Sequence, residues 1–592
     1  MSQLFNKIKV ASNNRSTFDL SHHQVTTSDF GYLIPICYRD LVPNDDIVVK
    51  PSIFTRLAPM AVPTFGRIKT SIFHFFVPYR LLYGHWDSFI TQDPNNHTVP
   101  PYALASDIKD TLSLDKQFNI NSSSSGIDRG HYCRVMSNLG LNPEVFLIDE
   151  IRGGLPISER FSMFPFLAYN RIYIDYFLDP SLGDHPLNVE IFNNLVKDGG
   201  NLFSVDANLA RSMFGTKFSA YKKDYFTTAR VNPQAGDASL VGVDIASDLN
   251  PSLSFSASAT NGNLKVGRSS TDSALPDSVY NSTQSQGTNS LIGQFTIEAL
   301  RAANSLQRYL ERNNFVGTKI INRLFAHFGV LPTPERLDMA EYIGGSSFPI
   351  QIGDVTSHSV HNYDNDDNID IRGLGYQAGK GVGAGQGDSV RYHAKEHGVF
   401  LSLMSIQPDT GYYQGISRFW QKGVNGDALD YFHPEFENLG YQEILNKELY
   451  VPKHDNYDQF DPDGIFGYSP RFSEYKFQND VLGGDFVGYN RYQGPTDPNV
   501  ATQDSWHLFR KLYYTNQNPL SLNLNFLQLH NSTTDYDRIF QFMDNSYDHF
   551  YFNIDVDVKA TRDMAGFGEP SLSATNEDDG KTVNLPYGGT RL

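Results

Sequence analysis

The chain has 592 residues, of which 40% are apolar, and this apolar share excludes a globally disordered protein. Its 66 acidic and 48 basic side chains give a net charge of −18, which excludes a surface that coats nucleic-acid phosphates throughout. Aromatic residues at 13%, with 47 glycines and 30 prolines, favour an all-β protein with many turns. At roughly 150 residues per domain the length allows about four domains, but nothing obvious divides the chain, so one large elaborated domain also fits.

The cysteines and the start of the chain bear on its compartment. Cys37 and Cys133 are too few for a disulfide framework in so long a chain, which favours a reducing compartment and buried thiols. Residues 1–16 lack the apolar run of a secretory signal, and no stretch approaches the ~20 apolar residues of a membrane span. The sequence therefore predicts a soluble intracellular product with no membrane span.

The first sixteen residues form a short basic arm. They contain Lys7, Lys9 and Arg15 and no acidic residue, whereas the rest of the chain is acidic. One hypothesis is that the arm faces the interior of an assembly and touches phosphates, and a frayed, solvated terminus is the alternative. Lys7, Lys9 and Arg15 are the candidate DNA-facing residues.

Strand-like runs follow the arm, at residues 32–38, 47–54 and 66–77. The third run is apolar on both faces in its second half, which is typical of a strand that lies between two layers. Since proline cannot donate to a strand ladder, we expect the prolines around these runs to mark strand ends and turns. They are Pro43, Pro51, Pro59, Pro63 and Pro78.

Helical spacing of apolar residues is rarer and recurs in three segments. The spacing predicts helices over Phe166–Phe177, Thr296–Arg312 and Thr318–Phe328, the last with the Thr318 hydroxyl as a possible cap. We expect all three apolar stripes to contact the core.

The pattern of regular elements stops between Val231 and Gly293. Residues 251–290 contain 11 serines, 4 threonines and 4 asparagines but only four charged side chains. Such a long polar segment favours an exposed insertion that carries recognition side chains, and a flexible linker between domains is the alternative. Lys265, Arg268 and Tyr280 are its candidate contact residues.

Several short motifs point to chemistry but do not withstand a geometric test. His393–His397 spells H-x-x-E-H, yet glycine-rich and strand-like sequence flanks it, and residues i and i+4 of a strand lie roughly 13 Å apart, too far to share a zinc ion. The glycine run 379–387 fails both the Walker and the G-x-G-x-x-G patterns, so we expect a flexible surface loop.

The sequence contains no motif that indicates a catalytic site. We find no G-x-S-x-G elbow and no nucleophile context around either cysteine, so no catalytic residue, metal ligand or cofactor is predicted. Solvated acidic loops are the expectation for two Asp-rich stretches, with calcium bound adventitiously or between subunits as the alternative. The stretches hold Asp364, Asp366, Asp367 and Asp370, and then Asp455, Asp458, Asp461 and Asp463.

A series of longer blocks resembles the major capsid protein of the Microviridae, the small icosahedral single-stranded DNA phages, and most closely its gokushovirus-like branch. The blocks keep the family's order over most of the chain, and only the last hundred residues match loosely. They are Ser16–Ile36, Phe54–Arg67, Phe73–Ile90, Leu167–Phe177, Asp224–Asp237, Leu300–Arg312, Glu341–Ile350, Glu396–Gly415, His433–Tyr450 and Phe466–Lys476.

The resemblance implies an all-β dominated fold, an eight-stranded antiparallel jelly roll of the viral capsid type with long loop insertions and a few helices. It implies a T=1 icosahedral shell around circular single-stranded DNA, located in the virion and assembled in the host cytoplasm. The implied organisation is an arm at 1–16 and one jelly-roll domain at 17–592, with a surface insertion at 232–293 that contacts the host. The implied partners are further copies of the chain, the viral DNA, a small basic DNA-packaging protein, an internal scaffolding protein, a minor pilot-type capsid protein and a host surface receptor.

Two other function classes stay open at this point. A host-binding spike of the virion would form small oligomers without shells. A β-rich glycoside hydrolase would use two carboxylates in a tyrosine-rich cleft and would be monomeric or a small oligomer.

Overall fold

The computed structural model describes most of the chain, in segments. The described residues are 15–60, 64–93, 99–113, 132–146, 155–179, 187–236, 244–245, 253–257, 264–268, 293–294, 297–317, 319–356, 377–424, 428–437, 440–451, 460–483, 510, 512, 521–529, 536, 539–540 and 548–564.

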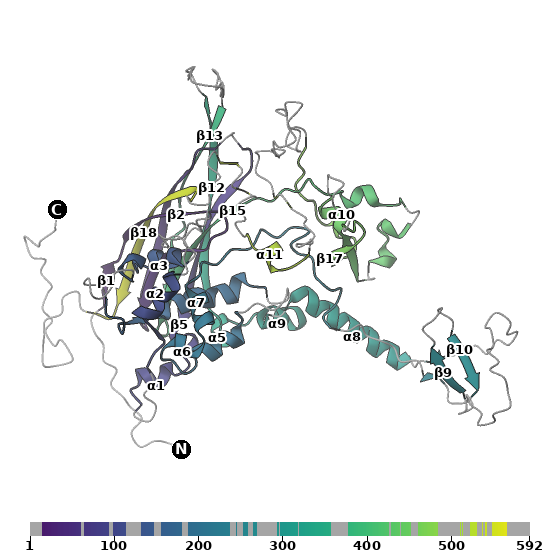
Figure 1. Ribbon diagram of the computed structural model, residues 1–592, viewed down its shortest axis with the longest axis horizontal. Coiled ribbons are helices and arrows are strands. Elements are labelled where there is room, and N and C mark those ends of the chain that lie inside the picture. Colours follow the sequence, from purple (N-terminus) through teal and green to yellow (C-terminus); the bar gives the residue numbers. More distant parts are fainter. Residues whose placement is uncertain are drawn as a thin grey trace, which may run out of the picture. The chain divides into compact units, whose positions relative to one another are not determined.

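A single antiparallel sheet of ten strands dominates the structure, and it curls strongly (Figure 1). Eight strands follow one hydrogen-bonded path in the order β1-β18-β4-β13-β12-β5-β15-β3, while β2 also pairs with β18 and β14 with β4. The bounds are β1 Ser16–Asp19, β2 His22–Ser28, β3 Ile34–Leu41, β4 Asp46–Leu57, β5 Ile68–Pro78, β12 Glu341–Thr356, β13 Gln377–Gln386, β14 Val390–His393, β15 Gly398–Pro408 and β18 Phe550–Arg562.

The long strand β12 divides this sheet into two halves. Residues 341–350 pair with β5, and residues 351–356 pair with β13. Numbered one to eight in chain order (β2, β3, β4, β5, β12, β13, β15, β18), the first half-sheet runs 1–8–3–6 and the second 5–4–7–2. This is the double Greek-key order of a jelly roll, so the predicted fold class is confirmed.

The barrel core lies between the two half-sheets. In β5, Ile68, Ile72 and Phe76 face this core, whereas Phe75 and Val77 face the opposite way, into a second cluster of buried side chains. The predicted strand between two layers is therefore confirmed. Cys37 belongs to the barrel core, and burial raises the pKa of its thiol to about 11.

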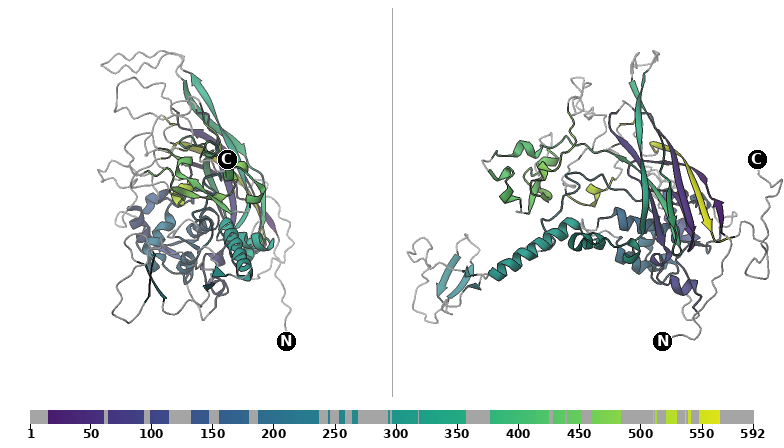
Figure 2. Two further views of the ribbon diagram at one scale, coloured as in Figure 1. Left: turned by 90° about the vertical axis from the view of Figure 1, so that its right-hand side faces the viewer. Right: turned by 180° about the vertical axis from the view of Figure 1, so that it is seen from behind.

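Helices in the long connection from β5 to β12 cover the outer face of the second half-sheet (Figure 2). The helix predicted at 166–177 is present as α4 (Phe164–Ile172) followed by one π-helical turn (Tyr173–Phe177), and its apolar residues are buried as expected. The other helices of this layer are α1 Trp86–Ile90, α2 Ala105–Ser113, α3 Cys133–Asn138, α5 Val189–Val196, α6 Leu202–Val205 and α7 Ala207–Phe214, beside the short strand pair β6 Tyr102–Leu104 and β7 Arg160–Ser162.

The connection from β15 to β18 builds a lobe with a small core of its own, which includes Phe226, Ile444, Phe466 and Phe526. Its elements are β16 (Tyr441–Leu445) paired with β17 (Ile465–Pro470), the short helices α10 (Asn446–Leu449) and α11 (Leu524–Leu527), and a 3-10 turn at Arg418–Gln421. We call residues 410–483 and 521–529 the lobe.

Residues 232–319 form a compact unit separate from the unit made by 1–231 with 320–592. The smaller unit holds the short paired strands β8 (Asp244–Ile245) and β11 (Gly293–Gln294), a hairpin of β9 (Leu253–Ala257) with β10 (Leu264–Arg268), and helix α8 (Ile297–Val316). The hairpin lies within the serine-rich segment, where composition alone indicated no regular element.

Two local predictions are wrong. The glycine run at 379–387 is mostly strand β13 rather than a flexible loop, because its glycines let the strand pass under large side chains: a Cβ on Gly385 would lie 2.0 Å from Phe348.

Pro51 lies inside β4 rather than at a strand end. Its carbonyl accepts from Gly387, so its nitrogen faces the same side, at the break between β13 and β14, where no ladder donor is needed.

Candidate assembly surfaces

The H-x-x-E-H segment is not helical. His393 ends β14 and its Nδ1 lies 3.1 Å from Asp46 Oδ1, whereas His397 precedes β15 and its ring lies 5.9 Å from that of Trp86. The two imidazoles thus have separate neighbours. Within the described ranges, no group of three His, Cys, Asp or Glu side chains is placed to hold a metal ion. Of the two Asp-rich stretches, only Asp461 and Asp463 are described, and Asp463 pairs with Lys447.

Of the predicted DNA-facing residues, Arg15 is described and Lys7 and Lys9 lie outside the described residues. The Arg15 guanidinium lies 3.1 Å from Asp46 and 3.1 Å from Asp563, at the edge where β1 pairs with β18. Burial raises the pKa of Asp46, but the hydrogen bond from His393 and the charges of Arg391 and Arg15 lower it more. Arg15 therefore ties the base of the basic arm to the sheet.

Of the predicted host-contact residues, Lys265 and Arg268 belong to strand β10, and Tyr280 lies outside the described residues. Thr318, the predicted cap, also lies outside them.

Helix α9 (Ile320–Phe328) presents Ile320, Phe325 and Phe328 to solvent, whereas Ile321 and Leu324 are half-buried. The helix itself was predicted, but its expected core contact is wrong: Phe325 is 58% exposed and Phe328 75%. The same correction applies to α8, where Leu300 and Leu306 are about half exposed. Helical spacing identifies an apolar stripe but not which molecule covers it. We define the α9 surface as Ile320, Phe325, Phe328, Val330 and Leu331.

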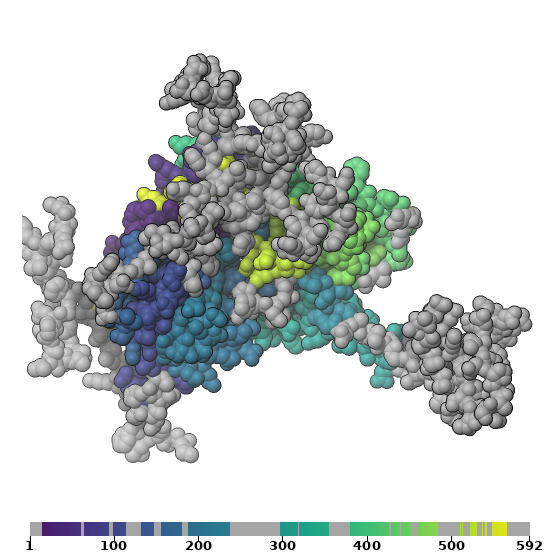
Figure 3. Space-filling view, in the orientation of Figure 1, coloured from purple at the N-terminus to yellow at the C-terminus, as the bar shows by residue number. Residues whose placement is uncertain are grey.

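The lobe, which is the green part of Figure 3, carries a second group of exposed apolar side chains. Phe419, Trp420 and Val424 are each at least 73% exposed, and Tyr431 and Phe432 are about half exposed. We call these five residues the aromatic surface. This surface was not predicted from the sequence, although the adjacent Phe419 and Trp420 beside the basic Arg418 are a usable signal of an interface.

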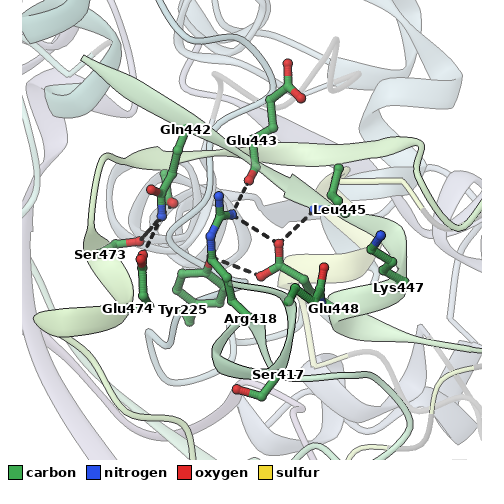
Figure 4. Close-up of polar contacts among 12 residues, drawn as sticks. Tyr225, Ser417, Arg418, Gln442, Glu443, Leu445, Lys447, Glu448, Ser473 and Glu474 are labelled. Carbon is green, nitrogen blue, oxygen red and sulfur yellow. Dashed lines mark hydrogen bonds and ion pairs between the residues drawn. The ribbon is translucent and has the colours of Figure 1, made fainter. Parts of the chain in front are cut away.

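A buried ion pair fixes the turn that carries Phe419 and Trp420 (Figure 4). Arg418 Nη1 lies 3.2 Å from Glu448 Oε1 and donates to the carbonyl of Glu443, and the Tyr225 hydroxyl donates to Glu448 Oε2 at 3.2 Å. The Glu448 side chain is 2% exposed, and this burial raises the pKa of its carboxyl despite the Arg418 charge. Because the guanidinium is held from inside the lobe, the neighbouring aromatic rings point outward.

A second cation is held in the same way. Lys422 Nζ lies 2.8 Å from Glu474 and 3.7 Å from the centre of the Tyr475 ring. Burial opposes ionisation of Glu474, yet the hydrogen bonds from Lys422 and Gln442 keep the pKa of its carboxyl below the usual value. Both cations of this segment are therefore engaged within the lobe rather than with solvent.

Exposed apolar side chains gathered in this number mark protein–protein contacts, because a monomeric surface rarely leaves them uncovered. A jelly-roll barrel whose long insertions expose two such surfaces has the architecture of a subunit that builds a viral shell.

Comparison with known proteins identifies the family. The family model described as "Capsid protein (F protein)" matches residues 6–572, so the chain belongs to this capsid protein family. It is similar to the capsid protein VP1 of Chlamydia phage 1, at 26% identity over 97% of this chain and 98% of that one. It is also similar to VP1 of Bdellovibrio phage phiMH2K (25%, 96% and 97%) and of Spiroplasma virus 4 (22%, 79% and 82%).

The resemblance to the major capsid protein of the Microviridae is thereby confirmed, and the protein is a structural component of the virion of a small single-stranded DNA phage, not an enzyme. Like the subunits of other shells, it self-associates. None of the helices that the structure describes combines the length and the apolar character that crossing a bilayer requires.

Proposed function

We propose that copies of this chain close into a T=1 icosahedral shell that encloses a circular single-stranded DNA genome. The observation that carries the proposal is the pair of exposed apolar surfaces on a jelly-roll barrel, because symmetric closure would cover them. In this scheme the barrel walls form the shell, and the insertions form the contacts between neighbours.

The basic arm faces the genome in this proposal. Lys7, Lys9 and Arg15 contact the DNA or a small basic packaging protein. Support for this orientation comes from the charge pattern, since the first sixteen residues contain no acidic residue in a chain that is otherwise acidic. With a net charge of −18, most of the phosphate charge is left to that protein and to counterions. An internal scaffolding protein and a minor pilot-type protein complete assembly, which takes place in the host cytoplasm.

The insertion at 232–293 faces the host receptor, and Lys265, Arg268 and Tyr280 are its proposed contact residues. Its division from the rest of the chain as part of a separate compact unit supports this role, since such a unit can vary without disturbing the barrel.

Negative-stain microscopy of the purified full chain tests the central proposal. We expect closed particles of uniform size. Trimers or pentamers without shells would instead indicate a spike, and monomers at every concentration would contradict the proposal.

A further inference from the structure

We infer that His22 is an acid-sensitive latch on the barrel: when its imidazole takes up a proton, the edge formed by β2 separates from the edge formed by β3. We call the line along which these two edges meet, residues 22–28 against 34–41, the seam. The latch lies within one copy of the chain, so it does not depend on the proposed shell.

Side chains close the seam. In the described part of the sheet β2 pairs with β18 and β3 pairs with β15, and no backbone ladder runs between β2 and β3. Both nitrogens of the His22 ring take part in the closure, so one proton acts on its centre. The bonds across the seam join His22 to the carbonyl of Ile36, Arg39 to His22 and to the carbonyl of Leu20, and Gln24 to the carbonyl of Pro35.

The partners of the His22 ring match its neutral form. The Ile36 carbonyl, 3.2 Å from Nε2, can only accept, and Arg39 Nη2, 3.0 Å from Nδ1, can only donate. A neutral imidazole has the one donor and one acceptor that this arrangement needs. The protonated ring has two donors, so in either orientation one of them faces the guanidinium.

The Arg39 guanidinium has no anion to offset it. Among the described residues no carboxylate forms an ion pair with Arg39: its bonds end on the carbonyls of Tyr38 and Leu20 and on His22, and its Nε is buried without a hydrogen-bond partner. A second positive charge at this half-buried site would meet an uncompensated cation, where water screens charge poorly. The pKa of His22 is lowered by burial and by the Arg39 charge, which agrees with this geometry.

The acids near the seam do not take over this role. On β18, Val556 lies opposite His22 and points into the barrel core, so its neighbours Asp555 and Asp557 point to the outer face. The remaining titratable side chains around the seam have partners of their own. These are Asp19 with Ser21, Asp40 with Tyr38 and Tyr79, Asp45 with Arg562, Asp548 with Arg134, His23 with Asn553 and His74 with Ser402.

Cys37 reports whether the seam is open. It belongs to β3, faces the barrel core and is 3% exposed. The Arg39 charge acts on its thiol, opposing the rise in pKa that burial causes, so the thiol lies close behind the latch. Cys133, 7% exposed in the helical layer, is an internal reference away from the barrel core.

Labelling of the two thiols in the purified full chain tests the latch. The reagent is a pyridyl disulfide, which reacts with thiols in acid, and mass spectrometry reads each site at pH 7.5 and pH 5.5. We expect the ratio of Cys37 to Cys133 labelling to rise by up to about tenfold at pH 5.5, because His22 in the open form takes up a proton near its ordinary pKa of about 6.5. An unchanged ratio would overturn the latch.

Two variants assign the response to His22. His22→Gln stays neutral at both pH values and can still donate to the Ile36 carbonyl, so it should abolish the rise. His23→Gln is the matched control, because His23 is exposed on the outer face of β2, and it should respond like wild type. A rise in His22→Gln equal to that of wild type would show that another group, such as His74, carries the acid response, and the latch would be wrong.

Hydrogen exchange of the wild-type chain is a second measurement that needs no variant. After correction for the effect of pH on the intrinsic rate, peptides from β2 and β3 should lose protection at pH 5.5 while peptides from β5 keep it. Equal loss in all three strands would indicate opening of the whole barrel and would contradict a latch at the seam.

Discussion

Arg39 of β3 and His22 of β2 lie side by side, with Arg39 Nη2 3.0 Å from His22 Nδ1, and they bridge the two edges of the curled sheet. Arg39 also donates to the carbonyl of Leu20 at 3.0 Å, and His22 Nε2 lies 3.2 Å from the carbonyl of Ile36. The imidazole therefore donates through Nε2 and accepts at Nδ1, which is the neutral tautomer. Burial and the Arg39 charge both lower the pKa of His22. The two edges of the barrel are thus joined by side chains.

Replacing this arginine should loosen the closure. Arg39→Met keeps the apolar stem but removes the donors to His22 and Leu20, and we expect it to lower the free energy of unfolding by about 2 kcal/mol. Since the nearby cation is lost, the pKa of His22 should rise in the same variant, which an NMR titration of the imidazole measures. Arg39→Lys retains the positive charge but not the several N–H donors of the guanidinium, and it should give a smaller loss in the free energy of unfolding. An unchanged unfolding midpoint for Arg39→Met would show that the bridge contributes nothing.

The barrel core should make the protein sensitive to acid through His74. Its Nδ1 lies 2.8 Å from Ser402 Oγ across the pairing of β5 with β15, and burial lowers the pKa of the imidazole to about 4. The unfolded chain binds this proton near pH 6.5 and the folded chain only near pH 4. Titration of His74 therefore leaves the free energy of unfolding unchanged above pH 6.5. Between pH 6.5 and pH 4 it lowers the free energy of unfolding by about 3 kcal/mol.

The measurement compares denaturant unfolding at pH 7 and pH 4.5. In His74→Gln, which retains a polar partner for Ser402, we expect a smaller loss of stability on acidification than in wild type. His433→Gln, at an exposed histidine, is the matched control and should follow wild type. Equal pH dependence of His74→Gln and wild type would contradict the assignment.

The elements that could be predicted from sequence are those whose burial is settled within the chain. Strand β5 shows this, because its two apolar faces are covered by the barrel core and by helices of the same protomer. Strand β13 was misjudged, since the reason for its glycines is Phe348 and Leu57, which lie far away in sequence and occupy the space a Cβ would need.

The candidate surfaces were harder to predict than the fold. Periodicity located helix α9, but the described part of this protomer leaves Phe325 and Phe328 exposed, and this exposure could not be inferred from the pattern. The aromatic surface depends on the buried pair Arg418–Glu448, whose members are thirty residues apart and are joined only by the fold of the lobe. The distance between the two residues in the sequence does not indicate that they form an ion pair.

Breaking that pair should destabilise the lobe and reduce assembly. Arg418→Met leaves the Glu448 carboxylate buried without its cation, and we expect a loss of about 3 kcal/mol in the free energy of unfolding, together with fewer particles. The double variant Arg418→Met/Glu448→Leu removes both charges and should recover most of the loss. A double-mutant cycle from denaturant unfolding measures the coupling. If the double variant is as unstable as Arg418→Met alone, the buried charge is not the cause.

Variants of the basic arm separate contact with the genome from anchoring of the arm. Lys7→Ala/Lys9→Ala should reduce the DNA packaged per particle without changing the melting temperature. Arg15→Ala should in addition lower the melting temperature, because it releases Asp46 and Asp563 from their ion pairs. The triple variant should show both effects. Packaging at the wild-type level in the triple variant, measured as the ratio of absorbance at 260 to 280 nm in purified particles, would contradict the DNA-facing proposal.

Deleting residues 251–290 tests the proposed role of the insertion. The backbone pairing of Ile245 with Gly293 brings together the two ends of the segment 246–292, so the residues left after the deletion, 246–250 and 291–292, can close a short loop. We expect intact shells that no longer adsorb to host cells. Lys265→Ala/Arg268→Ala/Tyr280→Ala keeps the length of the insertion and should weaken adsorption by about tenfold or more if these residues contact the receptor. Shells are counted by electron microscopy and adsorption by depletion of particles from the medium. Unassembled protein after the deletion would show that the segment is required within the shell rather than exposed on it.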